Sequence, residues 1–216
     1  MLTSKRMSGT SDTRDSESFP LLFEEGNIIV PAMEENLRQL RDIIRQKSLR
    51  IGDFTLTSGK KSSYYLDCRM TTLDPHGALL IARLILDRIR TQKIQADAIG
   101  GLTMGADPIA TAVAVVSAIE GQPLPAFIVR KETKAHGTQK AIEGWDGKPG
   151  ARVIVVDDVC TTGDSILKSA ERAEEAGYEV AAAFCVVDRE EGGTEIIAKR
   201  YPFYSLFTAK ELLKDA

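Results

Sequence analysis

Two adjacent carboxylates, Asp157 and Asp158, stand between an apolar run and a turn of small residues. The run, Val153–Val156, is continuous and β-branched, as expected of a parallel strand buried on both faces. The turn, Thr161–Ser165, opens a helix, and the free N–H groups of a helix start form a phosphate pocket together with nearby hydroxyls. Because like charges repel, we expect the two acids to hold sugar hydroxyls, a Mg²⁺ ion or a developing cation instead.

A weaker interpretation of this segment is a capped turn in which Asp157, Asp158 and Asp164 serve only the backbone. That interpretation suits an isolated Asp-Asp pair, but the strand before the acids and the turn after them favour a ligand site. The segment is not a Walker A loop, because the Gly-Lys-Ser/Thr ending of that motif is missing.

The segment Val153–Ser165 resembles the phosphoribosyl-pyrophosphate (PRPP) signature of type I phosphoribosyltransferases. By this resemblance the loop cradles the 5′-phosphate and the two acids hold the ribose hydroxyls. The ribose hydroxyls and the pyrophosphate share a Mg²⁺, so the metal is bound mainly through PRPP. The residues that the resemblance assigns to PRPP here are Asp157, Asp158, Val159, Cys160, Thr161, Thr162, Gly163, Asp164 and Ser165.

A cationic segment, residues 130–138, follows an expected strand and places three fixed cations and a histidine within seven residues. A solvated surface charge run is the usual meaning of such a segment. The pattern Arg-Lys-x-x-Lys-x-His-Gly, however, resembles the catalytic loop of orotate phosphoribosyltransferases, which reaches over the site of the neighbouring subunit. The resemblance implies a homodimer in which this loop closes as a lid and neutralises the departing pyrophosphate. The PRPP-binding residues implied are Arg130, Lys131, Lys134 and His136, and the catalytic ones are Lys134, His136, Asp157 and Asp158.

Two further segments resemble the parts of this family that select the base. Phe54–Tyr65 resembles its N-terminal hood, and Val187–Gly193 resembles the loop whose arginine, here Arg189, meets the orotate carboxylate. A bidentate guanidinium suits a planar carboxylate. The alternative for Arg189 is a surface ion pair with Glu190 or Glu191. The orotate-binding residues implied are Thr161, Arg189, Tyr64 and Tyr65.

The segment Gly100–Pro108 stands where the family has its pyrophosphate loop, and Thr103 is expected to contact PRPP there. In the family this loop often carries a strained peptide bond, which we expect between Gly101 and Thr103, chiefly at Leu102–Thr103. The sequence departs from the family pattern twice. Thr57 replaces a base-contacting lysine, for which Lys60 or Lys61 could compensate, and the pyrophosphate loop lacks the lysine that some members have.

Alternating strands and helices are expected to position these segments. We expect strands at 98–101, 126–129, 153–156, 178–187 and 203–207, a hairpin of 54–59 and 64–67, and helices from residues 33, 75, 107 and 165. This order predicts an α/β fold whose central, mostly parallel sheet is flanked by helices, with ligands beyond the carboxyl ends of the strands. The resemblance specifies the type I phosphoribosyltransferase fold with a small N-terminal hood. Residues 1–32 are expected to be an extension, poorly ordered at least to residue 18, and residues 33–216 a single domain.

Composition narrows the class of protein. The net charge of −3, from 28 basic and 31 acidic residues among 216, argues against nucleic-acid binding by bulk positive charge. No apolar run approaches the roughly 18 residues of a membrane span, and no secretory signal is readable. Cys68, Cys160 and Cys185 form neither a disulfide framework nor a zinc pattern, which suits free thiols in a reducing cytoplasm.

Together the resemblance and the residues favour an enzyme of de novo pyrimidine (UMP) biosynthesis. Its reaction would convert orotate and PRPP into orotidine 5′-monophosphate and pyrophosphate, with Mg²⁺ as cofactor. Two alternatives stay open: a phosphoribosyltransferase for another nucleobase, and a PRPP-binding regulator without catalysis. The Arg189 loop and the tyrosines of the hood disfavour the first, and the cationic segment with the net charge of −3 disfavours the second.

Overall fold

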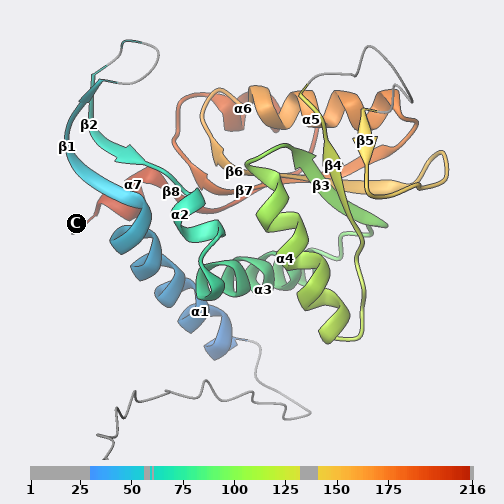
Figure 1. Ribbon diagram of the computed structural model, residues 1–216, viewed down its shortest axis with the longest axis horizontal. Coiled ribbons are helices and arrows are strands. Elements are labelled where there is room, and N and C mark those ends of the chain that lie inside the picture. The colour runs from blue at the N-terminus through green and yellow to red at the C-terminus, as the bar shows by residue number, and fades with distance from the viewer. Residues whose placement is uncertain (1–29, 56–58, 60, 132–140, 215–216) are drawn as a thin grey trace, which may run out of the picture.

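A six-stranded sheet forms the centre of the computed structural model, which describes residues 30–55, 59, 61–131 and 141–214. The strand order is β5-β4-β3-β6-β7-β8, and every pairing is parallel except that of β5 with β4 (Figure 1). This confirms the predicted α/β fold with a mostly parallel sheet. The strands are β3 (Ala98–Leu102), β4 (Ala126–Val129), β5 (Ile142–Glu143), β6 (Arg152–Cys160), β7 (Glu179–Asp188) and β8 (Phe203–Thr208).

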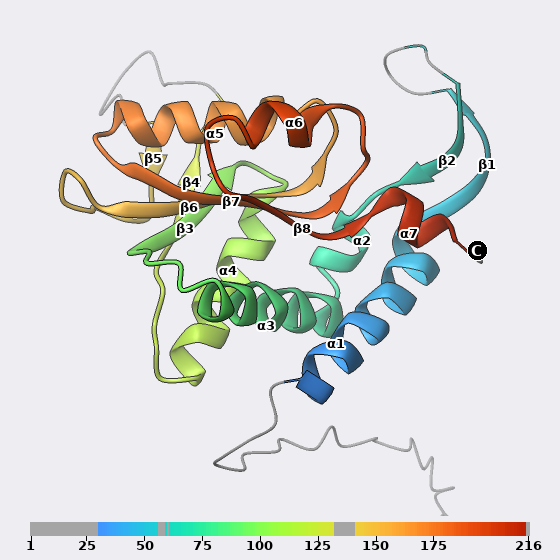
Figure 2. The same ribbon diagram turned by 180° about the vertical axis from the view of Figure 1, so that it is seen from behind.

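Helices cover both faces of this sheet. α5 and α6 lie on one face, and α3 and α4 lie on the other, with α1 packed beside α3 (Figures 1 and 2). None of the described helices is long and apolar enough to cross a membrane. The bounds are α1 (Val30–Ile43), α2 (Arg69–Thr72), α3 (Pro75–Thr91), α4 (Ala106–Ile119), α5 (Asp164–Glu175), α6 (Gly193–Ile197) and α7 (Ala209–Leu213).

Strand β6 carries the two acids and is longer than the sequence predicted. The expected strand ended at Val156, but β6 continues to Cys160, so the prediction that Asp157 and Asp158 lie in a loop was wrong. The reason is that β6 has two different neighbours. Its pairing with β3 ends at Val155, whereas its pairing with β7 continues to Cys160. The acids therefore stand on a strand that projects past β3 at the carboxyl edge of the sheet.

The core packs against both faces of β6. All four side chains of Val153–Val156 are fully buried, as the continuous β-branched run predicted. Full burial of such a side chain contributes about 1.5–3 kcal/mol relative to exposure. Ile154 and Val156 pack toward α1, α3 and α4, while Val155 packs toward α5 and α6. The strand that supports the acids is thus fixed from both sides.

A two-stranded hairpin stands beside the sheet as the predicted hood (Figure 1). Strand β1 (Leu49–Thr55) pairs antiparallel with β2 (Lys61–Leu66). The first strand begins at Leu49, five residues before the expected start at residue 54. The preceding helix starts at Val30, three residues before the expected start, and passes into a π-helical turn, Ile44–Ser48. Thr57 and Lys60 lie outside the described residues, and Lys61 is an exposed residue of β2.

The helix predicted from Pro75 is confirmed. Asp74 caps it, because its carboxylate accepts hydrogen bonds from the backbone N–H groups of His76 and Gly77. Short elements were missed, namely α2, α6, α7 and β5, since a few residues give no readable periodicity.

Candidate active site

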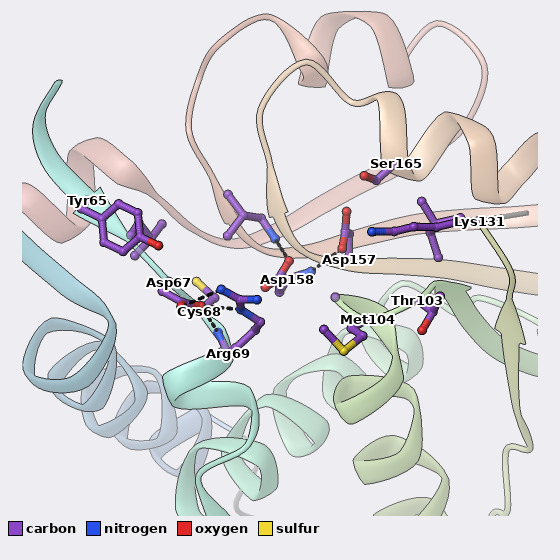
Figure 3. A pocket seen from close by; sticks show the side chains of 14 residues that line it. Tyr65, Asp67, Cys68, Arg69, Thr103, Met104, Lys131, Asp157, Asp158 and Ser165 are labelled. Atoms are coloured by element: carbon purple, nitrogen blue, oxygen red, sulfur yellow. Dashed lines mark hydrogen bonds and ion pairs between the residues drawn. The ribbon is translucent and has the colours of Figure 1, made fainter. Parts of the chain in front are cut away.

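The carboxylates of Asp157 and Asp158 line a cavity of about 340 Å³ (Figure 3). Asp157 is only 7% exposed. The backbone N–H of Asp158 donates to Oδ1 of Asp157 over 3.0 Å, and that of Val159 donates to Oδ1 of Asp158 over 2.9 Å. Burial, together with repulsion from Asp158, raises the pKa of Asp157 to about 7, and burial also raises the pKa of Asp158. The pair therefore favours neighbours that donate hydrogen bonds or carry positive charge, such as sugar hydroxyls or a cation.

The loop after β3 lies directly against this pair. A Cβ atom on Gly105 would clash with Oδ1 of Asp157 and stand 2.8 Å from Oδ1 of Asp158. Thr103 lines the same cavity, and its hydroxyl donates to Oδ2 of Asp107 over 2.6 Å. Glycine at position 105 therefore lets this loop approach the acids closely, whereas a Cβ there would require the loop or the carboxylates to shift.

The unusual peptide bond of this loop is a cis bond between Thr103 and Met104. The expected position, chiefly Leu102–Thr103, was wrong by one bond. Strand β3 remains regular through Leu102, which pairs with Val129, and the N–H of Thr103 still donates to the carbonyl of Val129 over 3.0 Å. The departure from regular strand geometry therefore comes one residue later.

A second, smaller cavity of about 220 Å³ adjoins Asp157 at the start of α5. The first N–H groups of a helix have no partners within it, so they are available to an anion. Gly163 precedes the helix with a φ of 86°, a conformation that favours glycine. The thiol of Cys160 is buried, so a ligand would meet the backbone there rather than the sulfur. The lining consists of Asp157, Val159, Cys160, Thr161, Thr162, Gly163, Asp164, Ser165 and Ile166.

The cationic segment is described only at its beginning. Lys131 lines the cavity of the two acids. Arg130 instead forms an ion pair with Glu143 of β5, with 2.6 Å between Nε and Oε1, and it does not line that cavity. Lys134 and His136 lie outside the described residues. Of the four predicted PRPP contacts in this segment, the structure thus brings Lys131 to the acids.

The predicted orotate-binding tyrosines, Tyr64 and Tyr65, lie on opposite faces of β2. Consecutive residues of a strand point to opposite faces. Tyr65 lines the cavity of the acids, whereas Tyr64 lines a different cavity of about 690 Å³ together with Arg189. Arg189 also forms the ion pair with Glu191 that the sequence left open as an alternative, over 2.9 Å.

Sequence reasoning missed Asp67, Cys68 and Arg69, which all line the cavity of the acids (Figure 3). Asp67 accepts two parallel hydrogen bonds from the guanidinium of Arg69, each 2.8 Å long. The available signal was the Asp-x-Arg spacing that begins two residues after Tyr65.

Oxygen ligands for a Mg²⁺ ion are few in the described part of the chain. No group of three or more His, Cys, Asp or Glu side chains there could hold a metal. Mg²⁺ commonly binds through one or two carboxylates together with water and substrate phosphates. Asp157 and Asp158 fit that partial role and would leave most positions of the ion to a substrate.

Comparison with known proteins places this geometry in a family. The pattern of the phosphoribosyl transferase domain matches residues 71–211. The orotate phosphoribosyltransferase of Aquifex aeolicus is 48% identical over 179 residues, which cover 81% of this chain and 96% of that protein. The crystal structure of the Mycobacterium tuberculosis orotate phosphoribosyltransferase with Fe(III) dicitrate is 39% identical with a TM-score of 0.72, covering 82% of this chain and 99% of that chain. Its complex with PRPP aligns with 32% identity and a TM-score of 0.65, covering 82% and 92% of the two chains.

Proposed function

The chain belongs to the phosphoribosyltransferase family, among the orotate phosphoribosyltransferases, and from this we infer how its residues perform the reaction of that group. The enzyme transfers the ribose 5-phosphate group of PRPP to orotate, giving orotidine 5′-monophosphate and pyrophosphate in pyrimidine biosynthesis. The observation that carries the residue assignment is the position of Asp157 and Asp158. Asp157 lines the small cavity at the start of α5, and both acids lie against the loop at Gly105.

In the proposed mechanism the acid pair holds the ribose while the bond to pyrophosphate breaks. Asp157 and Asp158 accept hydrogen bonds from the ribose hydroxyls and stabilise the positive charge that develops on the ring. The backbone of Thr161–Ser165 and its hydroxyls hold the 5′-phosphate at the start of α5. A ring nitrogen of orotate, whose proton the adjacent carbonyl acidifies, loses that proton to solvent and bonds to the anomeric carbon, and pyrophosphate departs with the electron pair of the broken C–O bond.

The leaving pyrophosphate and the base have separate partners in this proposal. Arg130, Lys131, Lys134 and His136 neutralise the charge that builds on the pyrophosphate, and Thr103 contacts it from the loop after β3. For the base, Arg189 pairs with the orotate carboxylate, while Thr161 and the hood tyrosines complete the site. Orotate must then compete with Glu191 for the guanidinium of Arg189.

A divalent cation and a second subunit complete the proposal. Mg²⁺ would bind mainly through PRPP, with the two acids nearby, and would neutralise phosphate charge. The enzyme would be a homodimer whose loop 130–138 reaches the neighbouring site, with residues 1–32 as an extension of a single domain. We propose a cytoplasmic location, because the buried Cys68, Cys160 and Cys185 are all free thiols. We also propose that neither nucleic acid nor membrane is a partner, since the net charge of −3 does not favour binding to phosphate by bulk positive charge.

The change in absorbance on mixing orotate, PRPP and Mg²⁺ with the enzyme tests the function. Conversion of orotate, with adenine, uracil and hypoxanthine left unchanged, is the expected result. Conversion of another base in its place would show that the base-selecting residues have been assigned wrongly. Product from no base, with PRPP still bound, would indicate a regulator.

A further inference from the structure

We propose that Arg69 is a further substrate-binding residue, which holds the pyrophosphate group of PRPP from the side of the cavity opposite Lys131 (Figure 3). The inference rests on the proposed function and adds to it a residue from α2. It concerns a segment that lies outside all five ligand-binding segments predicted from the sequence.

The guanidinium of Arg69 is fixed before any ligand arrives. Its Nε and Nη2 atoms donate in parallel to the two carboxylate oxygens of Asp67, and the backbone N–H of Arg69 donates to the same carboxylate over 3.2 Å. Hydrogen bonding to Asp67 raises the pKa of Arg69, so the group stays charged. A donor whose rotamer is already fixed loses little entropy when it binds a ligand. The ion pair with Asp67 therefore orients the guanidinium of Arg69 and leaves one of its nitrogens able to bind a ligand.

The opposite edge of the guanidinium is available to a ligand. Within the described part of the chain, Nη1 of Arg69 has no hydrogen-bond partner. The side chain is 50% exposed, although it belongs to the wall of a cavity. Arg69 also acts electrostatically on Asp158, where its charge lowers the pKa that burial raises. The guanidinium therefore lies close enough to Asp158 for their charges to interact, in the wall of the cavity that both residues line.

The distribution of charge around the cavity indicates which ligand this edge serves. Among the described lining residues, Arg69 and Lys131 are the cations, and the loop Leu102–Gly105 contributes no charged side chain. A pyrophosphate held at that loop would carry several negative charges next to two carboxylates. Anions are stabilised by charge-assisted hydrogen bonds. Arg69 and Lys131 therefore supply the positive charge that the loop itself lacks.

The same geometry argues against orotate as the ligand of Arg69. Tyr64 and Arg189 line the other cavity, which does not include Arg69 among its described residues. The two arginines thus line different cavities, and Lys131 is the cation that shares a cavity with Arg69.

Replacing Arg69 tests the assignment. In Arg69→Ala we expect the Kd of pyrophosphate, measured by calorimetry with Mg²⁺, and the KM for PRPP to rise about tenfold or more. The KM for orotate should change less than about twofold. A general structural role for Arg69 would instead affect both KM values. Arg172→Ala removes an equivalent ion-paired arginine from the far end of α5 and should leave all three constants unchanged.

The double variant Asp67→Asn/Arg69→Ala tests whether weaker pyrophosphate binding comes from the loss of Arg69 itself or from the charge of Asp67, which Arg69→Ala leaves without its partner. It removes both charges, so net charge is kept, and it should bind pyrophosphate as weakly as Arg69→Ala. Parental pyrophosphate binding in either folded variant would overturn the proposal, as would equal rises in both KM values. If instead the parent enzyme neither bound PRPP nor formed product, the proposed function itself would fail.

Discussion

The phenol oxygen of Tyr64 lies 3.2 Å from Nε of Arg189, which donates a hydrogen bond to it across 125 positions of sequence. The guanidinium carbon of Arg189 also stands 5.1 Å from the centre of the Tyr64 ring. The hood is therefore connected to the loop after β7 through this one side chain. The aromatic ring of Tyr64 and the carboxylate of Glu191 together restrict the orientation of the guanidinium.

Because of that orientation, Arg189→Ala should raise the KM for orotate far more than the KM for PRPP. Loss of a charge-assisted pair that leaves its partner buried typically costs on the order of 2–5 kcal/mol. Steady-state kinetics with each substrate varied in turn measures the effect. Glu191→Gln is the matched control, because it removes the ion pair that competes for Arg189 and should lower the KM for orotate or leave it unchanged. Equal changes in both KM values would place Arg189 elsewhere.

The acid pair should govern turnover. Asp157→Asn and Asp158→Asn keep the shape of each side chain but remove its charge, and we expect each to lower kcat strongly. Their positions on β6 make a check of folding necessary, since Asp157 is buried. Circular dichroism and melting curves provide that check. Near-parental turnover in the folded double variant would exclude the two acids from the handling of the ribose.

The raised pKa of Asp157 predicts a pH dependence of stability. Its folded pKa of about 7 exceeds the ordinary value of 3.8, so the folded protein binds a proton more tightly than the unfolded chain. The contribution of this proton binding to the free energy of unfolding is fully present below pH 3.8 and is lost as the pH rises toward and through 7. Relative to Asp157→Asn, the parent should gain about 1–2 kcal/mol of unfolding free energy between pH 7.5 and pH 5.5. Urea titrations at both pH values measure this; a constant difference between the two proteins would contradict the assignment.

Gly105 should be intolerant of even a methyl group. Gly105→Ala places a Cβ against Oδ1 of both acids, so either the loop or the carboxylates must shift. We expect kcat to fall sharply while the melting temperature falls modestly. Gly121→Ala is a control at a surface turn where a Cβ meets nothing, although its φ of 76° makes some loss of stability expected there too. Parental kcat in Gly105→Ala would show that the acids need no such close approach.

Local patterns predicted the elements better than their ends. The buried run Val153–Val156 and the capped start of α3 were readable because the signal lies in neighbouring residues. The end of β6 was not, since it depends on how far β7 continues beside it. The ion pair of Arg130 with Glu143 depends in the same way on β5, a two-residue strand without a pattern of its own.

The residues of the candidate site likewise differ in whether neighbouring sequence or the folded structure reveals them. Asp157, the turn after it and Arg189 stand in recognisable segments, so their residue types and spacing indicated a ligand site. Arg69 gains its significance from its charge interaction with Asp158, and Gly105 gains it from its close approach to both acids. A relation between segments far apart in sequence is visible only after folding.

The last prediction concerns the second subunit. Lys134 lies outside the described residues, and its assignment to the neighbouring site follows from the family resemblance of residues 130–138. If the loop acts in trans, each site of a two-fold dimer combines Asp158 of one subunit with Lys134 of the other. Lys134→Ala and Asp158→Asn can therefore be prepared as separate, nearly inactive homodimers and mixed under conditions that allow subunit exchange.

Each hybrid dimer then has one site with both defects and one site with neither. Random exchange makes about half of the dimers hybrids, so activity should recover to about a quarter of that of the parent. If Lys134 instead serves its own subunit, every site in every hybrid carries one defect and mixing restores nothing. Exchange must be demonstrated independently, for example by native mass spectrometry of differently tagged subunits. Exchange without recovered activity would exclude the shared site and leave the roles of Asp157 and Arg189 untouched.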